Sequence, residues 1–137
     1  MKVFIDTGAF CALTIPKDQH NHKAKSIYKQ IHKDKAVVCT SDYVLDETYT
    51  LLKMRGSHST AVKFMNQIDK CNITIFRVGA DIEESAKTIF RKIDDKRLSY
   101  TDCTSFALIN HLGIHAVFAF DEHFKYHPYS HPVKVLF

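Results

Sequence analysis

The chain has 137 residues, of which 45% are hydrophobic and 25% are charged, and its formal net charge is +4. No apolar run approaches the roughly 18 residues of a membrane-spanning helix, and the opening MKVFID lacks the basic segment and long apolar core of a signal peptide. We therefore expect a single cytoplasmic domain over residues 1–137, without membrane association, that folds without disulfides.

The hydrophobic pattern predicts an alternation of strands and helices. In chain order, the predicted elements are a strand at 2–5, helices at 9–13 and 22–33, a strand at 36–39, a helix at 42–55, a helix from 57 or 59 to 71, a strand at 73–78, helices at 82–93 and 100–112, and strands at 115–120 and 133–137. Apolar stripes at helical spacing predict that Met65 and Phe90 lie on the buried faces of their helices.

Strands that are separated by helices imply right-handed crossovers and parallel pairing. We therefore expect an α/β fold in three layers, with a central, mostly parallel sheet of four to five strands flanked by helices. The strand at 2–5 has no polar alternation and should be central, covered on both faces, whereas the strand at 133–137 should lie at an edge.

Polar caps and a glycine mark the ends of the predicted helices. Residues 40–42 can cap the helix that follows them, and Asp81 can cap the helix at 82–93. Ser99 and Asp102 have the S-x-x-D spacing of a capping sequence, and Gly113 ends the helix that they begin.

Two carboxylates follow apolar strands, Asp6 after KVFI and Asp121 after AVFAF. Strand ends of this kind rarely carry charge without a purpose. In open α/β sheets, ligands bind beyond the carboxyl ends of the strands. Both side chains are therefore expected at the edge of the sheet where a site would form.

Glu47 occupies a position in its helix where the helical period predicts an apolar residue. Counting by three and four from Glu47 meets Val44, Leu51 and Met54, so Glu47 is expected on the inward face. Asp46 falls on the opposite, solvated face and is left out of the site.

Asp102 belongs to a similar apolar stripe. Leu98, Phe106 and Ile109 lie three, four and seven positions from it, which predicts an inward side chain. An alternative explanation is that Asp102 only interacts favourably with the positive end of its helix. That explanation does not account for the apolar residues that share its stripe.

Four converging acids require a counter-charge. A buried carboxylate costs several kcal/mol unless it is paired or binds a cation. Ligands that offer only oxygen favour Mg²⁺, with Mn²⁺ as the other candidate, and Mg²⁺ usually takes part of its coordination from water and a substrate phosphate. This combination points to phosphodiester hydrolysis.

Zinc is a less favoured interpretation. The histidines that could suggest it lack the spacing of a zinc site, and we attribute them to surface polarity: His20, His22, His123, His127 and His131. The four cysteines form no C-x-x-C pair and are expected to be reduced core thiols.

Basic residues form two groups that suit a polyanionic partner. Six lysines lie between residues 17 and 35, where a solvated helix face explains them equally well. The second group comes just before Asp102 and is the better candidate for contact with RNA phosphates. It consists of Arg91, Lys92, Lys96 and Arg97.

At these residues the chain resembles the PIN-domain nucleases, and within them the VapC-type toxins of VapBC toxin–antitoxin pairs. FIDTGAF, DETYTLL, LSYTDCTSFAL and FAFDEHF are similar to the four family motifs, in order and over nearly the whole chain. The chain departs from the family pattern at Gly8, where serine is common, and at Ala119, where a hydroxyl residue is common.

The resemblance implies a Mg²⁺-dependent endoribonuclease in which Asp6, Glu47, Asp102 and Asp121 form the catalytic site. Asp6 and Asp102 are expected as direct metal ligands, Asp121 as a ligand directly or through water, and Glu47 as a ligand of a second metal or as the base. We expect Thr7 and Ser99 to support these ligands.

The resemblance also implies an RNA substrate, a VapB-type antitoxin as partner, and a homodimer. Two alternatives stay open. One is a PIN-type RNA-processing or structure-specific DNA nuclease that is not a toxin. The other is a non-catalytic binding protein of the same fold, in which salt bridges would hold the acids.

Overall fold

A computed structural model describes residues 1–137 as a five-stranded sheet in the order β3-β2-β1-β4-β5, in which every neighbouring pair is parallel. The strands are β1 (Lys2–Ile5), β2 (Val37–Ser41), β3 (Thr74–Phe76), β4 (Ala116–Phe118) and β5 (Lys134–Leu136). The predicted parallel α/β fold is confirmed, including the central place of β1 and the edge place of β5.

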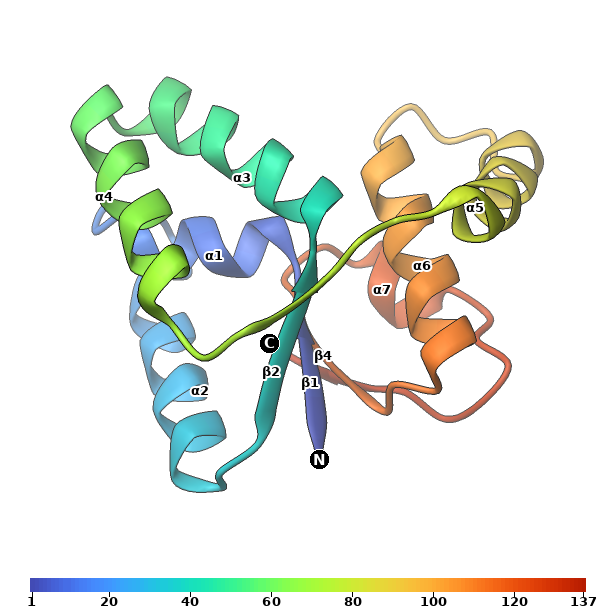
Figure 1. The fold of residues 1–137 in the computed structure, drawn as a ribbon, viewed down its shortest axis with the longest axis horizontal. Coiled ribbons are helices and arrows are strands. Elements are labelled where there is room, and N and C mark those ends of the chain that lie inside the picture. The colour runs from blue at the N-terminus through green and yellow to red at the C-terminus, as the bar shows by residue number, and fades with distance from the viewer.

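Seven helices cover the sheet. They are α1 (Thr7–Thr14), α2 (Asn21–Lys33), α3 (Asp42–Arg55), α4 (His58–Lys70), α5 (Ala80–Lys92), α6 (Tyr100–Leu112) and α7 (His123–Tyr126). Figure 1 shows α1 to α4 on one side of the strands and α5 to α7 on the other, which gives three layers. No helix is both long and apolar enough to cross a membrane.

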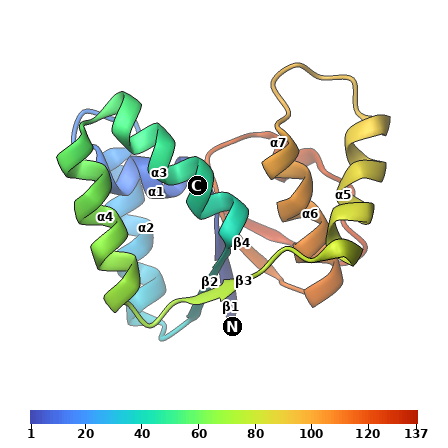
Figure 2. The ribbon, with the colours of Figure 1, turned by 45° about the horizontal axis from the view of Figure 1, so that its top comes forward.

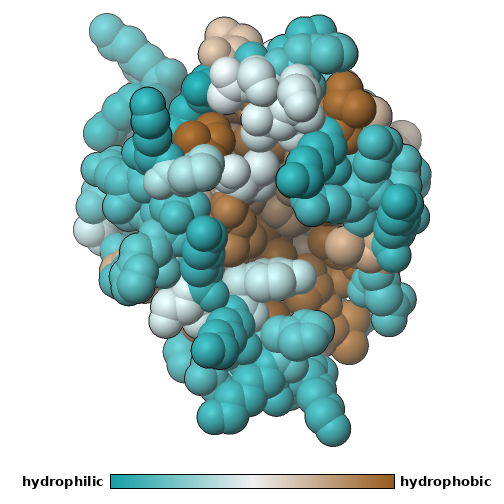
Figure 3. Space-filling view, turned by 90° about the vertical axis from the view of Figure 1, so that its left-hand side faces the viewer, coloured by the Kyte–Doolittle hydropathy of each residue, from teal (hydrophilic) through white to brown (hydrophobic).

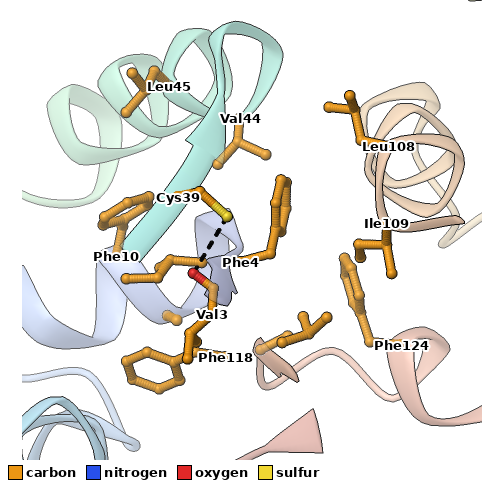
Figure 4. Packing of buried hydrophobic residues seen from close by; sticks show 14 of the residues in the cluster. Val3, Phe4, Phe10, Cys39, Val44, Leu45, Leu108, Ile109, Phe118 and Phe124 are labelled. Atoms are coloured by element: carbon orange, nitrogen blue, oxygen red, sulfur yellow. Dashed lines mark hydrogen bonds between the residues drawn. The ribbon is translucent and has the colours of Figure 1, made fainter. Parts of the chain in front are cut away.

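The core is built on β1, whose Val3, Phe4 and Ile5 are fully buried. Phe4 pairs with Cys39 of β2 and with Val117 of β4, so apolar strands flank it on both sides. Figure 4 shows how α3, α6 and the segment around Phe124 surround this strand, and how the thiol of Cys39 donates to the carbonyl of Val3. Strand pairing on both sides and burial of its side chains therefore fix β1 up to its last residue, Ile5.

Local capping determines several helix starts. The Oγ atoms of Ser41, Ser57 and Ser99 accept bonds from backbone N–H groups of α3, α4 and α6, respectively. Gly113 ends α6 with a φ of 62°, the left-handed conformation that favours glycine. Asp81 is not the cap of α5, because the helix begins at Ala80, two residues earlier than predicted, and Gly79 occupies the cap position.

Three predicted burials on helices are wrong, and the thiol of Cys71, which was expected in the core, is exposed. Met54, Met65 and Phe90 are 74%, 39% and 50% exposed. α3 and α4 pack against each other and α5 packs on α6, so the buried stripe of each helix is narrower than counting by three and four suggests. The short helix α7 was not predicted, because four residues are too few to display a helical period.

Candidate active site

The four predicted acids come from different elements that meet at the carboxyl ends of β1, β2 and β4. Asp6 directly follows β1 and precedes α1, and Asp121 lies three residues beyond β4. Glu47 is in the second turn of α3 and Asp102 is in the first turn of α6. Figure 2 shows the starts of α3 and α6 on either side of the strand ends.

Asp6 is only 3% exposed. Its backbone N–H donates to the carbonyl of Phe118 at 3.0 Å, which attaches the end of β1 to the end of β4. Burial, and then the neighbouring charge of Asp102, raise the pKa of Asp6 well above its usual value, although the N–H groups of Thr7 and Gly8 oppose the shift. The Oδ1 atom of Asp6 is buried without a hydrogen-bond partner.

Asp102 is 6% exposed and forms a capping box with Ser99. The N–H of Ser99 donates to Asp102 Oδ2 at 3.1 Å. Burial, and to a smaller extent the charges of Asp121 and Glu47, raise the pKa of Asp102 to about 6, against the opposing bonds from Ser99. Asp102 is therefore both a helix-capping residue and an inward-facing acid.

Glu47 lies at the margin of the buried face of α3. That face consists of Val44, Leu45, Thr48 and Leu52. Glu47 is half-buried and Asp46 is exposed. The prediction that Met54 shares a buried stripe with Glu47 is wrong. The negative charge of Glu47 is nevertheless close enough to raise the pKa of both Asp6 and Asp102.

Asp121 is bound by His123, a residue that the sequence suggested only as surface polarity. Asp121 Oδ1 accepts from the backbone N–H of His123 at 2.9 Å and lies 2.6 Å from His123 Nδ1. The other ring nitrogen, Nε2, lies 2.9 Å from Asp95 Oδ2. The bond to Asp95 first, and then the bond to Asp121, raise the pKa of His123 against the effect of its partial burial.

Ligand atoms of Asp102, Asp121 and His123 all lie within 4.8 Å of one another. The only sequence signal for His123 is its place two residues after Asp121, since its second carboxylate partner lies 28 residues earlier in the chain. The spacing of histidines and cysteines that is typical of zinc sites therefore does not single out His123.

The residues fit a hard divalent cation. Burial and mutual repulsion raise the pKa of both Asp6 and Asp102, and a nearby positive charge would relieve that repulsion. The unpartnered Oδ1 of Asp6 offers a lone pair that nothing else uses. Carboxylate oxygens are the ligands that Mg²⁺ and Mn²⁺ accept most readily.

Thr7 does not direct its hydroxyl toward the acids. Its Oγ1 donates to the carbonyl of Val44 at 3.3 Å and accepts from Thr48 Oγ1 at 3.3 Å. These buried bonds fasten the start of α1 to the turn of α3 that precedes Glu47. Thr7 therefore acts on the backbone beneath the site, while Ser99 contacts the carboxylate of Asp102 itself.

The four basic candidates lie at the end of α5 and on the connection to α6, and all of them are exposed. Arg97 is bound to Asp95, with Nε and one terminal nitrogen at 3.3 Å from its two carboxylate oxygens. The negative charge of Asp121 is also close enough to raise the pKa of Arg97. Arg91, Lys92 and Lys96 form no salt bridge with an acid in this structure.

Comparison with known proteins gives consistent matches. The sequence model of the PIN domain matches residues 3–128. The 23S rRNA-specific endonuclease VapC20 of Mycobacterium tuberculosis is 34% identical over 123 residues, which are 90% of this chain and 92% of VapC20.

Three crystal structures share the fold. That of Mycobacterium tuberculosis VapC20, described as a sarcin-ricin loop cleaving toxin, matches with a TM-score of 0.79 over 90% of this chain and 92% of its own. DNA-bound VapBC2 of Rickettsia felis matches with a TM-score of 0.70 and 12% sequence identity, over 98% of this chain and 97% of its own. DNA-bound VapBC of Salmonella typhimurium matches with a TM-score of 0.67 and 10% sequence identity, over 98% of this chain and 96% of its own. At such low identity, the two VapBC structures indicate the fold alone.

Proposed function

The chain belongs to the PIN-domain family, and from this membership we propose that it is a Mg²⁺-dependent endoribonuclease and the toxin of a VapBC-type pair. The observation that carries the proposal is the meeting of four carboxylates at one edge of the sheet, two of them buried with a raised pKa. Structural carboxylates without a cation would be expected to have salt-bridge partners, and Asp6 and Asp102 have none.

Asp6 and Asp102 are assigned as direct metal ligands, and Asp121 as a ligand directly or through water. When bound, Mg²⁺ would lower the pKa of a coordinated water and neutralise the charge of the scissile phosphate. Asp6 would use Oδ1, and Asp102 would use Oδ1 because Ser99 holds its Oδ2. Glu47 is half-buried and keeps access to solvent, so we assign it as the base that takes a proton from the attacking water. A role as ligand of a second ion is the alternative.

The substrate is proposed to be RNA, with 23S ribosomal RNA as the first candidate because of the identity to VapC20. We propose that the protein cleaves its substrate in the cytoplasm, where ribosomes are found. The exposed residues Arg91, Lys92, Lys96 and Arg97 are proposed to bind phosphates on either side of the cleaved bond.

The partner is proposed to be a VapB-type antitoxin. A hollow of about 540 Å³ lies between α1, α2 and α4, and Phe10, Leu13, Tyr28, Phe64 and Ile68 supply most of its apolar wall. Figure 3 shows apolar side chains exposed at the centre of this face within a hydrophilic rim. A groove of this type suits the apolar side of an amphipathic helix. We also propose a homodimer, which rests on the family resemblance and is tested by light scattering.

Cleavage of purified 23S ribosomal RNA, with Mg²⁺ or with EDTA, tests the proposal. Asp102→Asn can keep the capping bond but removes a charge from the metal site, so we expect a loss of about 100-fold or more with an unchanged fold. Asp46→Asn is the matched control, because its parent side chain is exposed on the same helix as Glu47. Equal losses in both variants would contradict the assignment.

Growth separates a toxin from other nucleases of this family. Expression of the wild-type chain alone should arrest growth, and Asp6→Asn or co-expression of an adjacent antitoxin should relieve the arrest. Normal growth with abundant, folded wild-type protein would favour an RNA-processing enzyme instead.

A further inference from the structure

His123 connects two carboxylates that lie far apart in the chain. One ring nitrogen lies 2.6 Å from Asp121 Oδ1 and the other 2.9 Å from Asp95 Oδ2. We propose that His123 is a positioning residue that fixes Asp121 for metal binding, and that Asp95 holds His123 in place. The inference rests on the proposed function, because it takes Asp121 as a metal ligand.

Both ring nitrogens of His123 face a carboxylate oxygen, Nδ1 toward Asp121 and Nε2 toward Asp95. Ionised carboxylates accept hydrogen bonds, so each contact suits a ring N–H donor. The ring therefore bridges the two acids, and the two contacts together set its orientation.

The contacts leave one oxygen of Asp121 available. Oδ1 accepts from both the backbone N–H and Nδ1 of His123. Two donors on one oxygen fix the rotation of the carboxylate, so that Oδ2 remains for a cation. Oδ2 forms no hydrogen bond in the structure.

The position of His123 is itself fixed. Phe124, the next residue, is fully buried and packs edge-on against Phe106 of α6 with ring centroids 5.0 Å apart. α6 also carries Asp102, so the two acids share a rigid support. Asp95 in turn accepts from the backbone N–H of Arg97 at 2.9 Å and from its guanidinium group.

This arrangement joins the basic connection between α5 and α6 to the metal site. Asp95 binds Arg97, a candidate for phosphate contact, with the same carboxylate that binds His123. An RNA strand that engages Arg97 would act on Asp121 through two side chains. The alternative role of His123, as a metal ligand itself, would require a ring nitrogen to break its contact with Asp121 or with Asp95.

Two substitutions of His123 separate its contacts. His123→Asn keeps a donor where Nδ1 stands but cannot reach Asp95, whereas His123→Gln can reach Asp95 but leaves Asp121 without its side-chain donor. Asp95→Ala removes the outer contact. Asp94→Ala is the matched control, since Asp94 is the exposed neighbour of Asp95 and forms no hydrogen bond through its side chain.

The measurements are the apparent affinity for Mn²⁺ and Mg²⁺ by calorimetry, the thermal midpoint without metal, and kcat and KM for RNA. We expect His123→Gln to weaken metal binding by about 10- to 100-fold and to lower kcat while KM for RNA is unchanged. His123→Asn should retain most of the affinity, Asp95→Ala should lose part of it, and Asp94→Ala should match the wild type.

Three results would overturn the inference. One is wild-type metal affinity in His123→Gln, and another is an equal loss in Asp94→Ala. The third is nitrogen coupling from a bound imidazole in the pulsed EPR spectrum of the Mn²⁺ form, because His123 would then be a ligand. A wild-type chain that binds neither metal would instead refute the proposed function and thereby the premise of the inference.

Discussion

The backbone N–H of Ser99 donates to Asp102 Oδ2 at 3.1 Å, and the backbone N–H of Asp102 donates to Ser99 Oγ at 3.0 Å. This reciprocal pair begins α6 and at the same time holds an acid of the candidate site. A residue that stabilises the helix therefore also orients a metal ligand. The two effects can be separated because the chain contains a second serine cap, Ser57, at the start of α4.

Ser99→Ala should reduce both stability and activity. Loss of a serine cap costs about 1 kcal/mol, and Asp102 would lose the partner that fixes its backbone. Ser57→Ala removes an equivalent bond, from Thr60 N at 3.0 Å, and should cost a similar amount without lowering RNA cleavage. Chemical unfolding and cleavage rates measure the two effects, and equal cleavage rates in the two variants would show that Ser99 has only a capping role.

Without metal, the protein should lose stability as pH rises from about 4 to about 7. The pKa of Asp102 is raised from 3.8 to about 6, so its favourable contribution is complete below the unfolded value and is lost as pH rises through 6. A shift of this size corresponds to about 3 kcal/mol. Asp6 acts in the same direction, whereas the lowered pKa of Asp95 has its effect below pH 3.8.

Mg²⁺ should reverse this trend, because it binds the ionised carboxylates and stabilises the folded state that holds them. Thermal melts across this pH range, in EDTA and in millimolar Mg²⁺, measure the effect. Asp102→Asn should reduce the metal-free slope without abolishing it, because burial still raises the pKa of Asp6. A wild-type slope of the opposite sign would contradict the inward, uncompensated position of the two acids.

Removal of exposed cations near the site should weaken RNA binding. Arg91→Gln and Lys96→Gln should raise KM and lower the slope of log affinity against log salt by about one unit for each cation lost, with metal affinity unchanged. Lys33→Gln is the control, because Lys33 is exposed at the end of α2, beside the amino end of the sheet. Identical salt slopes for all three variants would place the RNA elsewhere.

A charge in the apolar groove should prevent neutralisation by the antitoxin. Tyr28, which lines the groove, is 40% exposed, and Met65, on α4 outside the groove, is 39% exposed. Tyr28→Asp should keep RNA cleavage but lose antitoxin binding by at least tenfold, while Met65→Asp should keep both. Calorimetry with the purified antitoxin measures the difference, and full binding by Tyr28→Asp would assign the partner to another face.

Features with local causes were predictable from sequence. The caps at Ser57 and Ser99 and the left-handed Gly113 mark helix ends to within a residue, because the responsible bonds lie within one turn. Phe90 was misplaced because its exposure depends on how α5 sits against α6, where its ring meets the edge of Tyr100. His123 escaped notice because Asp95, which completes its environment, comes from another part of the chain.

The place of β1 at the centre of the sheet has a consequence for synthesis. Asp6 is synthesised long before Phe118, so its backbone N–H finds its partner, Phe118 O, only after the chain between them has been made. Asp121 follows later still. Pairing between such distant segments is slow to form, so the site cannot assemble on a nascent chain that lacks β4. We therefore expect the candidate site to be incomplete until β4 and Asp121 have been synthesised.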